Sequence, residues 1–193
     1  MFLLGIAASP RREGNSRILL REALSGAESA GAGVEEIVLN ELDFSGCQEC
    51  GGCEKTGECV VDDDMQMLYK KLAEADRFIV ASPIFFGSLP GQLKMMIDRC
   101  QCLWVGKYVL TKPQPGKTNR KGAFICVGGM KRQDYFESAR KLVKIFFAVI
   151  NVSYVDDLFY PGVDEKGAIL NHPTALGEAF ELGKRLAADG MQL

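Results

Sequence analysis

The sequence predicts an α/β protein in which helices cover both faces of a doubly wound, five-stranded parallel sheet. Three observations support this fold class. Short apolar runs alternate along the chain with segments of helical period, which is typical of βαβ units. A polar or glycine-containing loop follows each apolar run. The length of 193 residues, of which 47% are hydrophobic, suits one full core, so we expect a single domain over residues 1–193.

The first half of the chain is expected to hold strands at 2–8, 34–39 and 77–81, each a short apolar run. The first helix follows a turn at 9–16. Aspartates at 62–64 open the second helix, because carboxylates cap a helix and suit its positive N-terminal end. The apolar stripes of these helices are Ile18, Leu19, Leu20, Ala23, Leu24 and Ala27 in the first, and Met65, Leu68, Leu72 and Ala75 in the second.

The second half is expected to add strands at 122–129 and 152–159, with a last helix from just after Pro173 to Ala188. Residues 106–121 hold prolines, glycines and five basic side chains, which predicts a solvated insertion. The remaining two helices carry apolar stripes at Leu93, Met96, Ile97 and Cys100, and at Phe136, Leu142, Val143, Phe146 and Phe147.

The connection of these strands follows from general rules for α/β sheets. Chains of this size with five alternating strands commonly adopt the flavodoxin-like order 2-1-3-4-5, with right-handed crossovers. In that order a ligand binds at the switch point between strands one and three. The loops after strands one, three and four should therefore share one rim, where we expect the chemistry.

Composition excludes several classes of function. A formal charge of -2 argues against nucleic acid as the main partner, because neutralising the phosphates requires a basic face. No run approaches 18 apolar residues, so no membrane-spanning helix is expected. Seven cysteines, an odd number and tightly clustered, do not resemble a secreted disulfide framework. We therefore expect a cytoplasmic protein.

Four of the seven cysteines lie in one loop, at 45–62, after the second strand. Cys47, Cys50, Cys53 and Cys59 have the spacing C-x2-C-x2-C-x5-C, which lets one tight loop surround a metal centre. The first three resemble the run by which bacterial ferredoxins hold a [4Fe–4S] cluster. Zinc usually binds two separated C-x2-C knuckles, so it is the poorer match. Zinc and metal-free thiols stay open as alternatives.

The loop at 9–16 has the groups of a phosphate site, with hydroxyls, an asparagine, arginines and the start of a helix. An ordinary capped turn explains it as well. The loop at 83–91 is aromatic where a surface loop should be polar, which suits a planar ring or a subunit interface. It can also simply pack on its own core. Gly128 and Gly129 allow close backbone approach to a ligand, or mark a turn.

Motifs along almost the whole chain resemble the flavodoxin-like NAD(P)H-dependent FMN reductase superfamily, and within it the iron–sulfur flavoproteins. They are Ser9-Pro10-Arg11 with Asn15-Ser16, the four cysteines, Ala75-Asp76, the segment 82–87, Leu93-Lys94, Ile97-Asp98-Arg99 and Gly128-Gly129.

The resemblance implies FMN and a [4Fe–4S] cluster as cofactors. It implies that the FMN phosphate is held by Ser9, Arg11, Asn15 and Ser16. The ribityl chain and the isoalloxazine ring would be lined by Pro83, Ile84, Phe85, Phe86, Gly87 and Ser88, with Gly128 and Gly129 closing over the ring. The cluster would be ligated by Cys47, Cys50, Cys53 and Cys59. Phe85 departs from the tyrosine of many relatives, which removes a hydroxyl but keeps an aromatic face. Because the cysteine loop follows strand two, we expect it on the same rim as the flavin.

The leading hypothesis is an electron-transfer flavoprotein that takes electrons from ferredoxin or a similar donor and passes them to a small acceptor such as oxygen or hydrogen peroxide. The alternative is an NAD(P)H-dependent FMN or quinone reductase whose cysteines are metal-free or bind zinc. A third reading is an FMN-storing or redox-sensing protein without turnover. Apolar residues in the 83–91 loop and near Trp104 predict an oligomer, and the resemblance implies a homodimer or homotetramer.

Overall fold

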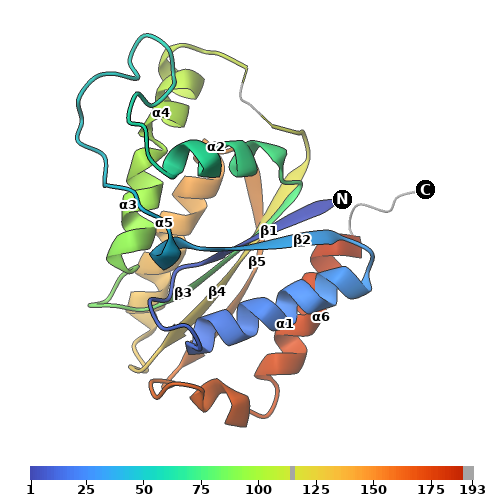
Figure 1. Cartoon of the computed structure of the whole chain (residues 1–193). Helices are drawn as coiled ribbons and strands as arrows, with labels where there is room; N and C mark the ends of the chain where they lie inside the picture. The colour runs from blue at the N-terminus through green and yellow to red at the C-terminus, as the bar shows by residue number, and fades with distance from the viewer. Residues whose placement is uncertain (114–115, 189–193) are drawn as a thin grey trace.

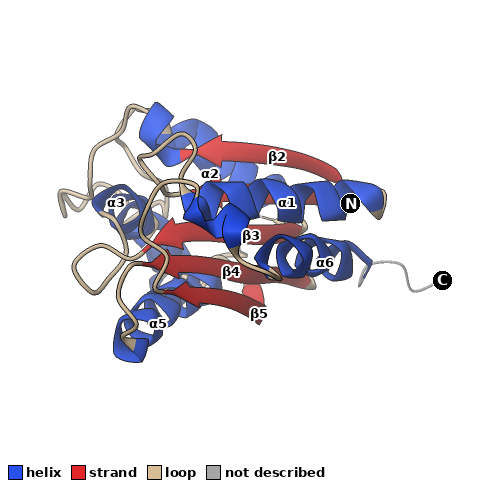
Figure 2. Cartoon of the chain, turned by 90° about the horizontal axis from the view of Figure 1, so that it is seen from below, coloured by secondary structure: helices blue, strands red, loops and turns tan. Residues whose placement is uncertain are grey.

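A computed structural model describes residues 1–113 and 116–188. Its centre is one parallel sheet in the order β2-β1-β3-β4-β5, which confirms the predicted fold class. Figure 2 shows the carboxyl ends of the strands, drawn as arrowheads, on the side of the sheet where many of the loops lie. The strands are β1 (Phe2–Ala7), β2 (Gly33–Val38), β3 (Arg77–Pro83), β4 (Arg120–Gly128) and β5 (Val152–Pro161).

Helices cover the two faces of this sheet, as Figure 1 shows. Alternate residues of a strand point to opposite faces, so Leu3 lies in the core beneath α1 and α6, and Leu4 in the core beneath α2, α3 and α5. Both side chains are fully buried. The helices are α1 (Asn15–Ser29), α2 (Met65–Glu74), α3 (Gly91–Arg99), α4 (Gln101–Trp104), α5 (Gln133–Val149) and α6 (Ala175–Ala188).

The segment predicted as a solvated insertion, 106–121, is more ordered than expected. A π-helix, η2 (Val105–Val109), continues directly from α4, and its Gly106 is buried. Arg120 is also buried and begins β4 two residues earlier than predicted, where it pairs with Val152. The basic composition predicted exposed side chains, but Arg120 donates to the carbonyl of Leu72 at the end of α2 and does not face water. Residues 114–115 of the segment lie outside the described part.

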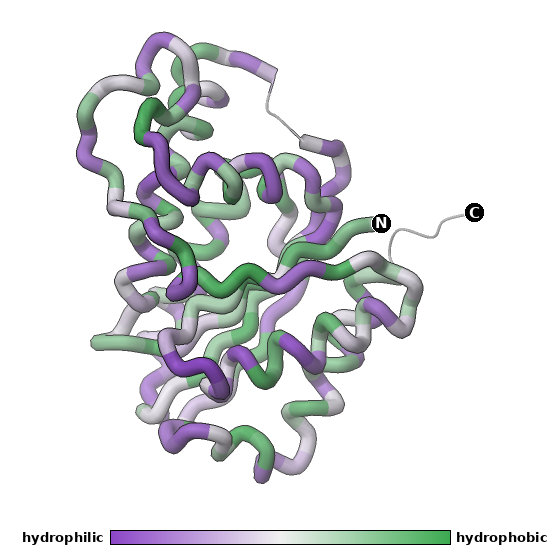
Figure 3. Tube along the Cα trace, in the orientation of Figure 1, coloured by the Kyte–Doolittle hydropathy of each residue, from purple (hydrophilic) through white to green (hydrophobic). Residues whose placement is uncertain are grey.

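The cysteine loop runs between the short 3₁₀ helix η1 (Leu39–Glu41) and α2. Figure 3 shows β1 hydrophobic along its length and the cysteine loop of mixed character. Near its start, Leu42 and Phe44 pack against the core beneath α2, α3 and α5. In the part of the chain that the structure describes, the helices are too short or too polar to cross a bilayer.

Candidate functional site

The loops after β1, β3 and β4 meet at one rim, as the strand order requires. They line a narrow cavity of about 60 Å³ that adjoins a wider one of about 540 Å³, and the two share four lining residues. Of the twelve residues that the sequence assigns to FMN, the narrow cavity is lined by Ser9, Arg11, Asn15, Ser16, Pro83, Ile84, Phe85, Gly128 and Gly129. The wider cavity adds Phe86 and Gly87, whereas Ser88 lines neither.

The narrow cavity ends at the start of α1. The Ser16 side chain is buried, and its hydroxyl has no hydrogen-bond partner among the described residues. Gly14, the N-cap, has no side chain with which to cap the helix, and no acidic residue lies in its first turn. The free backbone N–H groups and the dipole of such a helix end attract an anion. The cavity therefore fits a phosphate group.

Steric restriction, and not backbone conformation, requires glycine at position 14. Its φ of -74° is open to any residue. A Cβ atom there would lie 2.4 Å from the Ser9 hydroxyl oxygen and 3.1 Å from the carbonyl oxygen of Arg11. The Ser9 oxygen also accepts the Arg11 N–H at 3.2 Å, which closes the turn. The β1 loop is thus folded tightly around the cavity.

Sequence reasoning missed the loop after β5, which forms a fourth wall through Val163 and Asp164. The Asn15 side chain binds this loop, donating to the carbonyl of Glu165 at 2.8 Å and accepting the N–H of Ile169 at 3.3 Å. Arg11 donates to the carbonyl of Asp164 at 3.1 Å. The side chain of Asn15 therefore positions the wall and leaves its backbone N–H for a ligand. The turn at 161–164 directly after a strand was the available signal.

The wider cavity carries an exposed aromatic tip. Phe85 and Ser88 exchange both backbone hydrogen bonds, at 2.9 and 3.0 Å, so residues 85–88 form a tight turn. Phe86 and Gly87 have φ values of 48° and 75°, as a type I′ turn requires. Phe86 is fully exposed. A phenylalanine held in the left-handed region without a core contact is strained, and such strain marks functional sites.

The four cysteines line a separate cavity of about 550 Å³. Cys47 and Cys50 are exposed, and Cys53 and Cys59 are half-buried. Burial raises the pKa of the Cys53 thiol, and the three other cysteines of the loop raise it further. Within 1–113 and 116–188, no three histidine, cysteine, aspartate or glutamate side chains lie close enough together to hold a single metal ion. The other walls of the cavity include Val60, Val61, Arg99, Gln101, Cys102, Trp104, Val105 and Val109.

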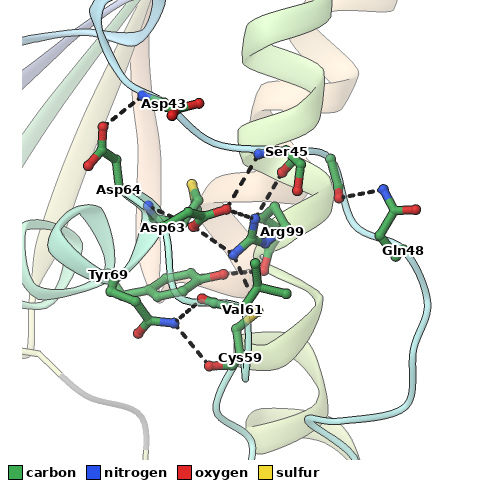
Figure 4. A network of polar contacts seen from close by, with 12 residues as sticks. Asp43, Ser45, Gln48, Cys59, Val61, Asp63, Asp64, Tyr69 and Arg99 are labelled. Atoms are coloured by element: carbon green, nitrogen blue, oxygen red, sulfur yellow. Dashed lines mark hydrogen bonds and ion pairs between the residues drawn. The ribbon is translucent and has the colours of Figure 1, made fainter.

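Arg99, at the end of α3, joins this loop to the rest of the fold (Figure 4). Its guanidinium contacts both carboxylate oxygens of Asp63, at 2.6 and 3.0 Å, and the carbonyl of Ser45 at 2.9 Å. One Nη2–H group points to the Cys59 sulfur at 3.4 Å. The Tyr69 hydroxyl donates to the Arg99 carbonyl at 2.8 Å. The sequence indicates Arg99 only as part of the motif Ile97-Asp98-Arg99 and does not predict its contact with the cysteine loop.

The charges of this network reinforce one another. Burial works to lower the pKa of Arg99, but the hydrogen bonds to Asp63 and Cys59 hold it above its usual range. The hydrogen bond from Arg99 in turn lowers the pKa of Asp63. Both groups are therefore charged at neutral pH, with a guanidinium beside one of the four sulfurs.

The expectation that the cysteines share the flavin rim is wrong for a single chain. Among the described residues, none lines both the cysteine cavity and either rim cavity. Helix α3 begins beside the rim and ends at Arg99, a rise of about 12 Å at 1.5 Å per residue. Figure 1 shows the cysteine loop climbing along α3 to α4, away from the 85–88 turn. The loop starts at the rim but carries its cysteines off it.

Known proteins show the same architecture. The NADPH-dependent FMN reductase family matches residues 1–162. An iron-sulfur flavoprotein of Methanocaldococcus jannaschii is 32% identical over 97% of this chain and 96% of its own length. Another, from Methanosarcina thermophila, is 34% identical over 68% of this chain and 65% of its own.

Solved structures agree on the fold. An NAD(P)H:quinone oxidoreductase from Methanothermobacter marburgensis has a TM-score of 0.74, 22% identity and 96% coverage of both chains. A flavone reductase has a TM-score of 0.76 and 22% identity, covering all of this chain and 64% of its own. The chain therefore belongs to the flavodoxin-like NADPH-dependent FMN reductase family, and within it to the iron-sulfur flavoproteins.

Proposed function

We propose that this protein is an FMN-binding electron-transfer flavoprotein with a [4Fe–4S] cluster, which takes electrons from ferredoxin or a similar donor and passes them to a small acceptor such as oxygen or hydrogen peroxide. As a member of its family it is a flavin-dependent oxidoreductase. The proposal is carried by one observation, that four cysteines of one loop line one cavity beside a buried guanidinium.

FMN fits the rim by the chemistry of its two ends. The phosphate would be held by Ser9, Arg11, Ser16 and the backbone at Asn15, where a buried hydroxyl lacks a partner. The ring would lie against Phe85, Phe86 and the glycines at 128–129. The flavin supplies one- or two-electron chemistry, and the cluster single electrons.

The cysteine cavity fits a cluster better than a single ion. A cubane spreads its four thiolate ligands over separate corners, farther apart than the ligands of one tetrahedral zinc. All four cysteines line one cavity of about 550 Å³. The names of the matched relatives add support, because several are iron-sulfur flavoproteins.

The separation of the two cavities favours an assembly of copies. Within one chain, electrons between the sites would have to pass the length of α3. Each site also exposes apolar side chains, Phe86 and Met130 at the rim and Tyr108 and Val109 near the cysteines. A homodimer or homotetramer that brings one copy's rim to another's cysteine loop would shorten the path and cover these surfaces.

The second candidate is an NAD(P)H-dependent FMN or quinone reductase. The cavity of about 540 Å³ beside Phe86, Gly87 and Tyr135 favours it, because an aromatic-edged space next to the flavin rim suits a second planar ring. The cysteines would then be metal-free or bind zinc. A cytoplasmic location, common to both candidates, stays a prediction.

Anaerobic stopped-flow spectroscopy separates the candidates. We expect reduced ferredoxin to bleach both the flavin and the iron–sulfur absorbance within seconds, and NADH or NADPH to leave them unchanged on that timescale. Rapid bleaching of the flavin by either nucleotide, with no response to ferredoxin, would replace the proposal with the reductase.

A further inference from the structure

We propose that Arg99 is a positioning residue of the cysteine site, which holds Cys59 in place and raises the reduction potential of the group that the cysteines bind. This inference rests on the proposed function, since it assigns a role toward the cluster.

Arg99 joins the Cys59 sulfur to the start and the end of the cysteine loop. Its side chain is 1% exposed, and that of Asp63 is 15% exposed. The guanidinium donates N–H groups to Asp63 and Ser45. Another N–H group points toward the Cys59 sulfur, 3.4 Å away. These partners lie 36 to 54 residues apart from Arg99 in the sequence, so the contact ties both ends of the cysteine loop to α3.

One donor of the guanidinium is left over. The Nε–H group is buried and has no hydrogen-bond partner among the described residues. This atom has almost no accessible surface, so it does not border the cysteine cavity, and the contact with the site is made by Nη2. Arg99 therefore offers the cysteine site one donor, the Nη2–H group that points to the Cys59 sulfur.

A hydrogen bond and a positive charge near a thiolate cluster favour its reduced form. Reduction adds one electron, supplied by the flavin or an external one-electron donor, while Arg99 neither gains nor loses a proton. The added negative charge lies near the Arg99 guanidinium, whose side chain is 1% exposed and is therefore weakly screened by solvent. Hydrogen bonds to the sulfurs and net charge are known levers on cluster potentials.

The test is the midpoint potential of the cluster, measured by anaerobic titration, in Arg99→Gln, Arg99→Lys and Asp63→Asn. We expect R99Q to lower the equilibrium constant for reduction of the cluster at least tenfold. For one electron this is a fall of about 59 mV in the midpoint potential. R99K keeps the charge but not the fork, so its potential should fall between R99Q and wild type. D63N should shift the potential the other way, because it removes a negative charge behind Arg99.

The opposite directions of the potential shifts in R99Q and D63N distinguish an electrostatic effect on the cluster from a purely structural role of Arg99. An arginine that only holds the loop would give R99Q and D63N shifts of the same direction, which overturns the proposal. The exposed Arg185→Gln, on α6, changes the net charge equally and should leave the potential unchanged. If R99Q binds no iron, R99K and D63N carry the same test, and an unchanged potential in both overturns it.

Failure of the proposed function looks different. If anaerobically purified wild-type protein holds no iron or labile sulfide, both the cluster and this role of Arg99 are disproved. Iron in wild type, with a potential insensitive to Arg99, removes only this inference. In the apoprotein, hydrogen exchange of the amides at 45–63 should be faster in R99Q than in R185Q, and equal rates would contradict the positioning role.

Discussion

The two candidate sites of this chain are built in different ways. The rim site consists of short loops at the ends of buried strands, and its residues already hold one another through Ser9, Asn15 and the carbonyls of 164 and 165. The cysteine site lies on a long segment, 42–64, that contains no helix or strand. Its principal polar anchor is Arg99.

This difference teaches that a sheet can present one site nearly complete and leave the other dependent on few contacts. Residues at strand ends inherit the rigidity of the sheet. A loop of thiols gains much of its order from the metal that it binds, because metal binding and local folding are coupled. Changes at one site should therefore leave the other intact, and changes in the cysteine loop should act mainly through metal content.

The largest expected effect is the loss of the cluster in Cys53→Ser. A serine removes one of four thiolates, so iron and labile sulfide should fall to near background, while FMN content stays at the wild-type level because the cavities share no described residue. Metal and flavin analysis of the anaerobic protein measures both. Cys100→Ala is the matched control, since Cys100 is buried in the core outside this cavity and should keep its iron. Parallel loss of FMN in C53S would break the comparison.

Gly14→Ala should damage the rim alone. The added methyl would overlap the Ser9 oxygen and press on the backbone of the turn, at the upper end of the roughly 1–3 kcal/mol that overpacking costs. FMN affinity should fall on the order of 100-fold, measured by fluorescence titration of the apoprotein. Gly177→Ala, where a Cβ meets nothing within 4 Å, should bind FMN normally. Equal affinity in both variants would contradict the assignment.

Ser16→Ala should have opposite effects on stability and binding. Removing a buried hydroxyl without a partner should leave the apoprotein equally stable or more stable. Losing a donor to the phosphate should weaken FMN about tenfold, or about 1.4 kcal/mol. Ser29→Ala is the contrast, because its hydroxyl donates to the carbonyl of Gly26, so it should lose stability and keep FMN affinity. A destabilised S16A that binds FMN normally would show that Ser16 is structural.

Phe86→Gly should stabilise the apoprotein by about 1 kcal/mol, because glycine adopts a φ of 48° without the cost that a side chain carries. Phe86→Ala keeps that cost and loses the ring. Both variants should weaken flavin binding or assembly to the same extent, and only F86G should melt at a higher temperature. Thermal unfolding and sedimentation measure the two effects, and equal melting temperatures would argue against backbone strain.

The smallest effect is confined to acid. The Arg99 hydrogen bond lowers the pKa of Asp63, so the ion pair stabilises the folded loop fully above the ordinary carboxyl pKa of 3.8 and is lost as pH falls through the lowered value. Trp104, the only tryptophan, lines the cysteine cavity and reports the change. Its fluorescence in the apoprotein should change below pH 3.8, and Asp63→Asn should remove that transition. A transition that persists unchanged in D63N would assign it to another group.

Much of the fold was predictable because local patterns decide it. Alternating apolar runs and helical stripes predicted the five strands, and the general rule for five-stranded α/β chains predicted their order. Eleven of the twelve residues assigned to FMN line the two rim cavities. The four cysteines of one loop also meet at one cavity, as their spacing suggests. The strands and the cysteine loop depend on neighbours in sequence, and the rim follows from the strand order of this fold class.

The parts that sequence reasoning missed depend on distant contacts. Asn15 binds a loop 150 residues away, and Arg99 binds Asp63 and Cys59 across 36 and 40 residues. The direction of the cysteine loop was also missed, because it is set by its packing along α3 and against Gly106, to which Gly57 comes close. Such contacts follow from tertiary packing and leave no periodic signal in the sequence.

The central claim is that one chain carries a flavin site and a separate cluster site. Anaerobic purification followed by visible spectroscopy with iron, labile sulfide and flavin analysis tests it most directly. We expect FMN together with iron and sulfide in the proportions of one [4Fe–4S] cluster per chain. Flavin bands alone, with neither iron nor labile sulfide, would contradict it.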